Sequence, residues 1–510
     1  MSGGFTALDF LVLALYIVGV TGFGMWLGRG QEGAKDYFLG GNNLPWGAVL
    51  FSVVATETST LTFLSIPGVA YVTDLGFLQL TFGYLIGRVV VAFVLLPAYY
   101  RGHLTTAYGL LEERFGLSTR RFASAIFMFT RALADGVRLF ATAIPLALIT
   151  GWSYPVSILV MGVFTLVYTY HGGIRSVVWV DAIQMVIYLG GAIGALAVLI
   201  AAVPGGWGGL MDAAGAAGKL HLFQMHFTWS EPFTLWSGLL GGAFLSMASH
   251  GADQLIVQRL LTCKNLKDSQ LALIGSGVMV ILQFALFLVI GLALWSFYGG
   301  RTFARTDEIF ATFIIQQLPP GVTGLVIAAI FAAAMSSLAS SVNSLASAST
   351  YDFYAALRGG TEAELFRVGR ISTLIWGVVL VGGALLFRSQ DTPVVELGLA
   401  IASFTYGGLL GGFFLAILNR RANQRDALWG IGTGIVVMSA IVFAKWYVPI
   451  FTAVGLSSLA VHLRAIGTVA WPWFVVIGTL ITFLVGSLLS LTHGAVPDGH
   501  GHARGHGQGS

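Results

Sequence analysis

The chain has 510 residues, of which 56% are hydrophobic and only 9% are charged. Soluble domains carry about 25% charged residues, so this composition excludes a soluble protein and predicts an integral membrane protein. The single cysteine, Cys263, excludes an internal disulfide. The net charge of +4 is typical of basic cytoplasmic loops in a membrane protein, and we expect no nucleic-acid partner.

Thirteen apolar segments along the chain are long enough to cross a bilayer, which takes about 20 residues. Their predicted limits are 7–28, 46–70, 75–100, 119–151, 154–171, 174–203, 234–260, 268–298, 320–356, 364–388, 393–418, 425–447 and 466–491. The first run lacks a basic start, so we expect a spanning helix there and no cleavable signal. We therefore predict an all-α, multi-pass protein with about 13 transmembrane helices.

Lysine and arginine are distributed unevenly between the two sides of these predicted spans. If the N-terminus lies outside, seventeen basic residues fall in inner segments and six in outer ones. Short cytoplasmic segments carry the excess of basic residues in membrane proteins. We predict an external N-terminus, a cytoplasmic C-terminus and a location in the cell (inner) membrane.

The second predicted span contains the polar segment ATETSTLTFLSIPG, from Ala55 to Gly68. It holds the carboxylate of Glu57, six hydroxyl side chains and a Pro-Gly pair. A kinked structural helix would explain the hydroxyls, but a charge inside a span is costly and usually functional. Broken helices are tolerated in a membrane where they line a cavity, as they do in transporters.

Charged and polar residues recur in five further spans. In the fourth span Arg131, Asp135 and Arg138 share one helical face, which fits either a buried ion pair or a positive site for an anionic substrate. Arg88 in the third span is expected to be paired. In the sixth span Asp181 either pairs with Arg175 or has a functional role.

The seventh span ends in SMASHGADQLIVQRLL, and the ninth contains AAAMSSLASSVNSLASAS. In the ninth, the hydroxyls of Ser336, Ser340, Ser344 and Ser347 lie along one face, where they serve either helix packing or ligand binding. The chain has no HExxH, GxSxG, CxxC or GxxxxGK[ST] motif, so we expect no enzyme and no nucleotide-driven pump. An ion gradient is the expected energy source.

Six motifs, in this order, resemble those of the sodium/solute symporter family: DYFLGG, ATETSTLTFLSIPGVAY, TAYGLLEERFG, GGIRSVVWVDAIQ, GADQLIVQRLL and AAAMSSLASSVNSLASASTYDFY. The flanking sequences are most similar to those of bacterial sialic-acid carriers. The resemblance implies a LeuT-like core of two inverted five-helix repeats with discontinuous helices.

On this basis the chain divides into six parts. They are a peripheral helix and cytoplasmic loop (1–45), the first repeat (46–203), an extracellular loop (204–233), the second repeat (234–418), two peripheral helices (419–492) and a disordered His/Gly-rich tail (493–510). A weak metal site is the alternative for the tail histidines, His493, His500, His502 and His506.

The resemblance also implies a sodium site. Its ligands are expected to be the backbone carbonyls of Ala55, Thr58 and Ala333 and the hydroxyls of Ser336 and Ser337. Glu57 is expected to tune cation affinity, and Asp181 to lie beside the inner exit. Asp181, Ser336 and Ser340 match a second sodium site of some relatives, but Ala339 stands where those relatives have serine.

The substrate pocket implied by the resemblance involves Ser59, Thr62, Phe82, Gly83, Arg138, Ser246, Ser249, His250, Met279 and Gln283. Ser246 and Met279 stand where sugar carriers have polar or charged groups, which disfavours a sugar. Sialic-acid carriers have an arginine where this chain has Asp135, and Arg138 follows three residues later. We therefore expect a small organic anion.

The resulting prediction is a sodium-coupled secondary active importer that works by alternating access in a lipid bilayer. A proton-coupled importer, a solute-binding sensor with a transporter fold and a channel are the alternatives. Substrate identity, sodium stoichiometry and oligomeric state do not follow from the sequence.

Overall fold

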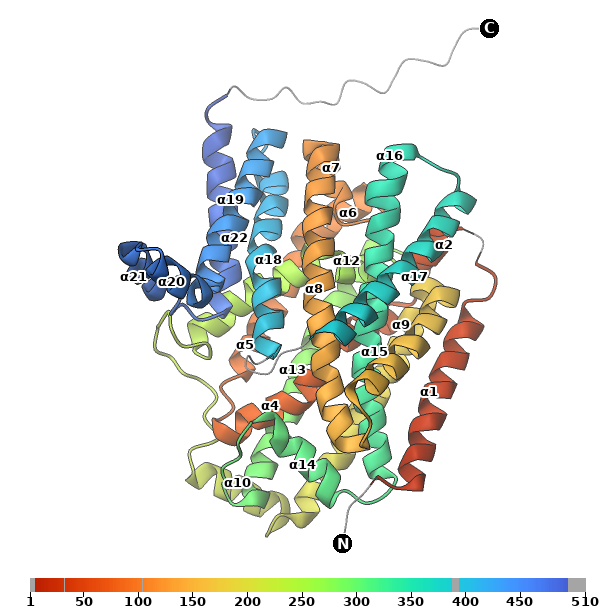
Figure 1. The fold of residues 1–510 in the computed structure, drawn as a ribbon, viewed down its shortest axis with the longest axis vertical. Coiled ribbons are helices and arrows are strands. Elements are labelled where there is room, and N and C mark those ends of the chain that lie inside the picture. The colour runs from red at the N-terminus through yellow and green to blue at the C-terminus, as the bar shows by residue number, and fades with distance from the viewer. Residues whose placement is uncertain (1–4, 32, 103, 388–393, 494–510) are drawn as a thin grey trace.

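The structure is a computed structural model that describes residues 5–31, 33–102, 104–387 and 394–493 (Figure 1). In these residues all regular structure is helical, apart from an isolated β-bridge between Leu44 and Cys263. Many of the helices run roughly along one axis of the bundle, with α1 beginning near one end and α22 ending near the other (Figure 1). The predicted all-α class is confirmed.

The helices of the first half lead from the N-terminus to the extracellular loop predicted from the sequence. They are α1 (Ala7–Leu27), α2 (Ala34–Leu39), a 3-10 turn (Gly40–Asn42), α3 (Trp46–Glu57), α4 (Thr60–Val72), α5 (Leu78–Val90), a π-helical turn (Val91–Leu95), α6 (Leu96–Arg101), α7 (Gly109–Phe115), α8 (Leu117–Thr150), α9 (Tyr154–Ala202) and α10 (Gly206–Ala216).

The second half begins with another π-helical turn. Its elements are that turn (Ser237–Gly241), α11 (Gly242–Gly251), α12 (Gln254–Leu260), α13 (Leu266–Tyr298), α14 (Asp307–Gln317), α15 (Val322–Ala348), a π-helical segment (Ser349–Ala355), α16 (Ala356–Arg358), α17 (Glu362–Leu386), α18 (Val394–Leu418), α19 (Gln424–Val442), α20 (Ala444–Ala453), α21 (Ser457–Ile466) and α22 (Pro472–Ser490).

The predicted number of spans is not confirmed. Among the described residues, eight helices are long and apolar enough to cross a membrane, or nine if the bent pair α3–α4 counts as one span. The predicted fifth and sixth spans are the two helical segments of α9, which meet at a kink at the non-helical Gly173 (φ 49°, ψ −150°). The predicted seventh span is divided between α11 and α12, and each of these helices is too short to cross by itself.

Helix α15 forms the centre of the bundle, and almost all of its side chains are buried. It packs against α9, α1, α8 and α17. Small residues allow these helices to approach closely: a Cβ added to Gly191 of α9 would lie 2.9 Å from the Cβ of Ala329. The alanine- and serine-rich sequence of this helix therefore serves packing along most of its length.

The C-terminal part differs in detail from the two predicted spans. α18, α19 and α22 pack together, and the short helices α20 and α21 project sideways between α19 and α22 (Figure 1). α19 ends at Val442 and α22 begins at Pro472, so both are shorter than predicted. His493 contacts Asp426 at 2.8 Å. The predicted disordered tail from 494 to 510, with its three remaining histidines, lies outside the described residues.

Candidate sodium and solute site

The predicted broken helix is confirmed between α3 and α4. α3 ends at Glu57, Thr58 is extended (φ −80°, ψ 113°), and Ser59 begins α4 as a cap whose hydroxyl accepts from the backbone N–H of Thr62. The two helices meet at a bend of 63°. A helix end leaves its last carbonyls without intrahelical donors, so this break exposes backbone oxygens inside the bundle.

Helix α15 supplies a hydroxyl to this break. Ser336 Oγ lies 2.9 Å from the carbonyl oxygen of Ala55 and 3.2 Å from that of Ala333, and the side chain is fully buried. A small cavity beside it is lined by Ala55, Thr58, Gln184, Met185, Tyr188, Ala332, Ala333 and Ser336. Four of the five predicted sodium ligands thus line one cavity. Neutral backbone and hydroxyl oxygens suit a hard cation.

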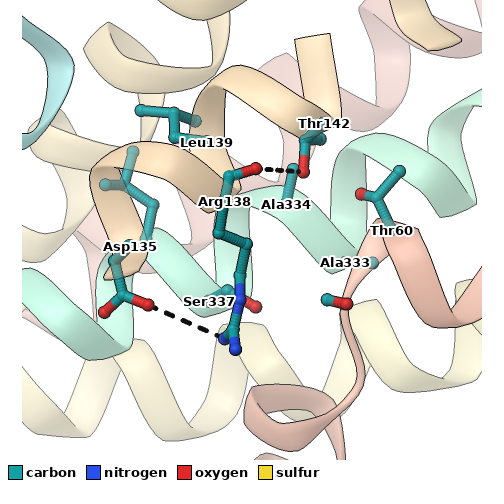
Figure 2. Close-up of a pocket in the computed structure, with 10 residues that line it drawn as sticks. Thr60, Asp135, Arg138, Leu139, Thr142, Ala333, Ala334 and Ser337 are labelled. Atoms are coloured by element: carbon teal, nitrogen blue, oxygen red, sulfur yellow. Dashed lines mark hydrogen bonds and ion pairs between the residues drawn. The ribbon is translucent and has the colours of Figure 1, made fainter. Parts of the chain in front are cut away.

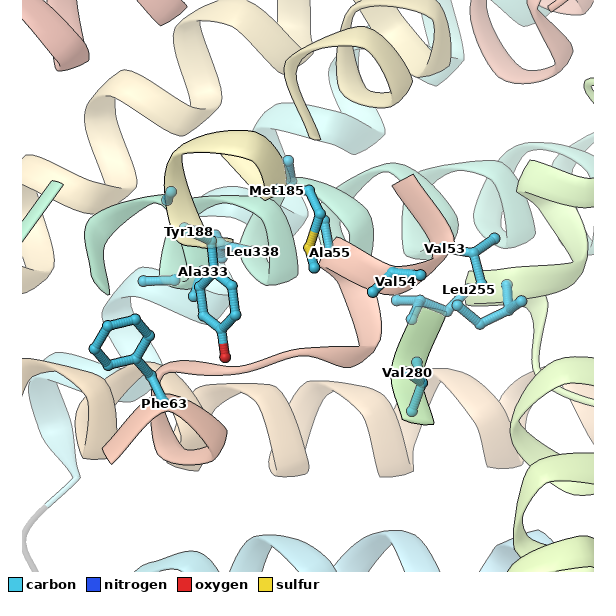
Figure 3. Close-up of a cluster of buried hydrophobic side chains, with 14 of the residues drawn as sticks. Val53, Val54, Ala55, Phe63, Met185, Tyr188, Leu255, Val280, Ala333 and Leu338 are labelled. Atoms are coloured by element: carbon cyan, nitrogen blue, oxygen red, sulfur yellow. The ribbon is translucent and has the colours of Figure 1, made fainter. Parts of the chain in front are cut away.

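Aromatic and aliphatic side chains close the break on its other sides. Phe63 of α4 packs edge-to-face against Tyr188 of α9, with ring centroids 5.1 Å apart, and stacks on Phe310 of α14. Figure 3 shows the rings of Phe63 and Tyr188 next to each other beside the extended segment, with Ala55 and Ala333 nearby. This packing separates the exposed carbonyls from lipid.

A second cavity adjoins the first and holds the fifth predicted ligand. It has a volume of about 10 Å³ and is lined by Ser59, Thr60, Asp135, Arg138, Leu139, Thr142, Ala333, Ala334, Ser337 and Leu338. Arg138 extends from α8 toward Ser337 of α15 (Figure 2). The hydroxyl of Ser337 is buried and has no hydrogen-bond partner among the described residues. Ala333 lines both cavities, so the two are neighbours.

Arg138 carries the positive charge of this second cavity. Its side chain is 31% exposed, and its Nη1 lies 3.7 Å from Asp135 Oδ1. Asp135 also lies 3.4 Å from Arg131 and accepts a hydrogen bond from Ser341. Arg131 in turn pairs with Asp253. The buried ion pair predicted for this face of α8 is therefore present at Arg131, and Arg138 lines the cavity.

Glu57 points to a different group of residues. Its carboxylate pairs with Arg88 of α5 and lies 3.6 Å from His250 of α11. His250 is also 3.0 Å from Arg88 and 2.8 Å from the hydroxyl of Ser249. Arg88 is thus paired, as expected. Arg88 and His250 both contact Oε2 of this carboxylate, so that oxygen is already paired.

The predicted substrate residues fall into groups with different neighbours. Ser59 and Arg138 line the cavity of Figure 2. Ser246, Ser249 and His250 lie in α11, on the side of Arg88 and Glu57. The hydroxyl of Ser246 is buried without a partner among the described residues.

The other predicted substrate residues have contacts of their own. Gln283 is bonded to the Thr58 hydroxyl at 2.8 Å, and the Thr62 hydroxyl accepts from the backbone of Ser59. Phe82 stacks on Phe223 of the loop before α11. Gly83 serves helix contact, because a Cβ there would lie 2.2 Å from the carbonyl oxygen of Gly238.

The sequence reasoning missed several residues that line the Arg138 cavity. These are Thr60, Leu139, Thr142, Ala334 and Leu338. Thr142 follows Arg138 by four residues, so it occupies the same helical face. That spacing is the one signal in the sequence that could have identified it.

Asp181 has a partner that was not expected. Its Oδ2 lies 2.7 Å from the hydroxyl of Ser52 and 3.3 Å from Arg259 Nη2. Arg259 also donates to Ser340. The alternative pairing with Arg175 is not observed, since Arg175 is exposed and Asp181 is buried.

Comparison with known proteins places this geometry in a family. The model of the sodium:solute symporter family matches residues 37–434. The sodium/sialic acid symporter NanT of Aliivibrio fischeri is 30% identical over 492 residues, covering 95% of this chain and 93% of that protein. The sodium/sialic acid symporter SiaT of Proteus mirabilis is 29% identical over 479 residues, covering 92% of this chain and 96% of that protein.

A solved structure has the same fold. It is a Na⁺-coupled sialic acid symporter in a substrate-bound outward-open state, with a TM-score of 0.85, 27% identity and coverage of 96% of this chain and 99% of that one. This match confirms the predicted LeuT-like fold, and the relatives are transporters rather than enzymes. The chain belongs to the sodium:solute symporter family.

Proposed function

We propose that this chain imports a small organic anion together with sodium. The observation that carries the proposal is the contact between the broken helix and α15. Ser336 bridges the carbonyls of Ala55 and Ala333, and the cavity beside this contact contains Arg138. A cation site and an anion site would then share one wall, which is the arrangement that coupling between two ligands requires.

The cation site is proposed to bind sodium through the carbonyls of Ala55, Thr58 and Ala333 and the hydroxyls of Ser336 and Ser337. Ser337 lines the Arg138 cavity and follows Ser336 in the chain, so its hydroxyl can complete the sodium shell or contact the solute. A proton-coupled mechanism through Glu57 is less favourable. Protonation of Glu57 would leave the buried Arg88 without its counter-charge, at a cost of about 3–5 kcal/mol.

The solute is proposed to bind Arg138 through an anionic group. Arg138 has one carboxylate neighbour at 3.7 Å and remains partly exposed to the cavity. A planar guanidinium can bind a carboxylate with two parallel hydrogen bonds. The cavity adds the hydroxyls of Ser59 and Thr142, and side chains such as Leu139 provide apolar surface. The sialic acid carried by the relatives is itself a carboxylic acid.

The position of the contact between the broken helix and α15 fits a mechanism of alternating access. Sodium would join α3 and α4 to α15 and so stabilise the form in which the solute cavity is complete. Without sodium, Ser336 is the described hydrogen-bonding link between Ala55 and α15. The distribution of basic residues and the opposite positions of α1 and α22 in the bundle support an external N-terminus and a cytoplasmic C-terminus.

A thermal-stability screen of the purified protein tests the solute class. Carboxylates, including sialic acid, should raise the melting temperature more with sodium than with choline, because each ligand would favour the same form. Neutral sugars should have no effect. Arg138→Gln should lose the response to carboxylates but keep the response to sodium, and the exposed Arg464→Gln serves as the matched control. Stabilisation by carboxylates that persists in Arg138→Gln would contradict the proposed anion site.

A sensor would bind the same solutes without moving them. Uptake into vesicles, measured against sodium at fixed pH and against pH at fixed sodium, separates the three candidates. The importer proposed here should respond to sodium, a proton-coupled importer to pH, and a sensor to neither.

A further inference from the structure

A chain of alternating charges leads from the Arg138 cavity toward the beginning of α8. Arg138 Nη1 lies 3.7 Å from Oδ1 of Asp135 (Figure 2), and Arg131 Nη1 lies 3.4 Å from the same oxygen. Arg131 Nη2 in turn pairs with Oδ2 of Asp253 and lies 2.8 Å from the hydroxyl of Tyr406. The proposed transport mechanism gives Arg131, Asp253 and Tyr406 no role.

Asp253 contacts Arg131 and Tyr406, and this Asp253 contact joins three separate elements. Arg131 belongs to α8, Tyr406 to α18, and Asp253 lies between α11 and α12. The Tyr406 hydroxyl donates to Asp253 Oδ2 at 2.8 Å, and Asp253 Oδ1 accepts from the backbone N–H of Leu255, where it caps α12. Arg131 and Asp253 are both buried, so their attraction is little screened by salt, and the contact holds α8, α12 and α18 together.

A small cavity, the Arg131 cavity, lies beside the Asp253 contact. It is lined by Phe127, Thr130, Arg131, Ala134, Asp253, Thr405, Tyr406 and Leu409, and its volume is about 10 Å³. A cavity of this size holds about one water molecule. The hydroxyl of Thr130 is buried and has no hydrogen-bond partner among the described residues. The Arg131 cavity therefore has a polar group available to water or to a passing polar solute.

The Arg131 and Arg138 cavities follow each other along α8. Arg131 precedes Arg138 by seven residues, which is about two helical turns, or about 10 Å. The beginning of α8, at Leu117, lies on the cytoplasmic side in the proposed orientation. A solute that leaves Arg138 toward the inside along α8 therefore reaches the Arg131 cavity next. Both cavities are too small to pass an organic anion, so the Asp253 contact must part first.

An anion bound at Arg138 would weaken the Asp253 contact through Asp135. Oδ1 of Asp135 is shared between Arg138 and Arg131. When the anion draws Arg138 away, Arg131 becomes the main counter-charge of that oxygen and is attracted toward it. Asp135 and Asp253 then compete for one guanidinium, because both carboxylates contact it. The charge of the solute thus acts on the Asp253 contact while the solute is still at Arg138.

We propose that the solute leaves toward the inside along α8, that the Asp253 contact is the inner gate on this route, and that an anion at Arg138 loosens the gate. The inference rests on the proposed import of an anion and on the proposed orientation, and it adds the release route. Arg131, Asp253 and Tyr406 are positioning residues, since they hold helices together rather than the solute.

The accessibility of a single cysteine tests the gate. Cys263, the only cysteine of the chain, is replaced by alanine, and Ala134→Cys places a thiol in the lining of the Arg131 cavity. This parent protein is sealed into vesicles of either orientation. The rate of its labelling by a cationic, membrane-impermeant methanethiosulfonate reagent is measured from each face.

Two variants of the parent should open the gate without solute. Tyr406→Phe loses a hydrogen bond to a charged group and should speed labelling from the cytoplasmic face by about 10-fold or more. Asp253→Asn loses the ion pair as well and should label faster still. Tyr354→Phe is the matched control, because it loses an exposed tyrosine–carboxylate contact with Glu364, and its labelling rate should equal that of the parent.

Sialic acid is the probe for the link between solute and gate. With sodium present, it should speed labelling of the parent severalfold from the cytoplasmic face. Asp135→Asn interrupts the chain of charges but keeps Arg138. Sialic acid should still raise the melting temperature of this variant, while its labelling stays at the basal rate. If sialic acid does not stabilise the parent, the carboxylate with the largest thermal shift replaces it.

Unchanged labelling in both Tyr406→Phe and Asp253→Asn would overturn the gate, as would an increase confined to the external face. If Asp253→Asn does not fold, Tyr406→Phe decides the question, because it keeps the ion pair. An anion that stabilises the parent without speeding its labelling would refute the link to the solute. Failure of the proposed function is a different outcome: neither sodium nor any carboxylate then stabilises the protein, although the gate variants still label faster.

Discussion

Replacing Ser336 with alanine should weaken sodium binding without unfolding the protein. Its hydroxyl lies 2.9 Å from the carbonyl oxygen of Ala55 and 3.2 Å from that of Ala333, so it is placed to complete a shell of neutral oxygens. Hydrogen bonds to charged groups contribute about 1.5–3 kcal/mol, and the loss of a cation–hydroxyl contact should be similar. That energy corresponds to sodium affinity reduced by about 10- to 150-fold.

Sodium-dependent thermal stabilisation measures this effect without a transported solute. The melting temperature is followed against sodium at constant ionic strength, and the midpoint concentration gives the affinity. Ser344→Ala is the matched control, because Ser344 lies on the same helix, is equally buried and bonds to the carbonyl of Ser341 at 3.1 Å, away from the break. An unchanged sodium midpoint in a folded Ser336→Ala would refute the assignment of this hydroxyl.

Two further predictions follow from the same contacts. Arg138→Gln should raise the KM for the transported anion by about 5- to 30-fold, a range reduced for partial exposure, and should leave the sodium midpoint unchanged in uptake assays. Gly83→Ala should destabilise the protein by about 1–3 kcal/mol, because the added methyl meets a backbone carbonyl. Gly190→Ala, where a Cβ has no neighbour within 4 Å, should not lower the melting temperature.

The polar residues inside the predicted spans identified the segments that form the candidate sodium site. A carboxylate inside an apolar run indicated the break between α3 and α4, because backbone exposed to lipid is too costly unless it lines a site. The Pro67-Gly68 pair does not mark the break, since it lies inside α4. The spacing of Ser336 and Ser340 placed their hydroxyls near one another on α15, and the structure connects the two residues at 2.6 Å.

The sequence did not reveal which residues on different helices contact each other. Arg259 and Asp181 are separated by 78 residues, and periodicity fixes the face of each helix but not the helix that it meets. The resemblance therefore led to Asp181 and Ser340 as a cation site, while the guanidinium that contacts both was not anticipated. The same limit explains why Ser246 and His250 were expected beside Arg138 but lie near Arg88.

The ends of the helices could not be predicted closely, because they depend on packing between helices, which the hydropathy pattern does not record. The division between the predicted spans 154–171 and 174–203 does fall at a kink, at the non-helical Gly173 within α9. The last two spans were predicted too long because the apolar residues of α20 and α21 extend the hydrophobic pattern beyond α19.

The central claim is that a sodium gradient drives uptake through a cation held between the broken helix and α15. Its most direct test is uptake by the purified protein in sealed vesicles, with the anion selected by the stability screen and with sodium, proton and potential gradients imposed one at a time. The account predicts that an inward sodium gradient alone concentrates the anion above its external level. Equal accumulation without sodium, or accumulation driven only by a proton gradient, would contradict it.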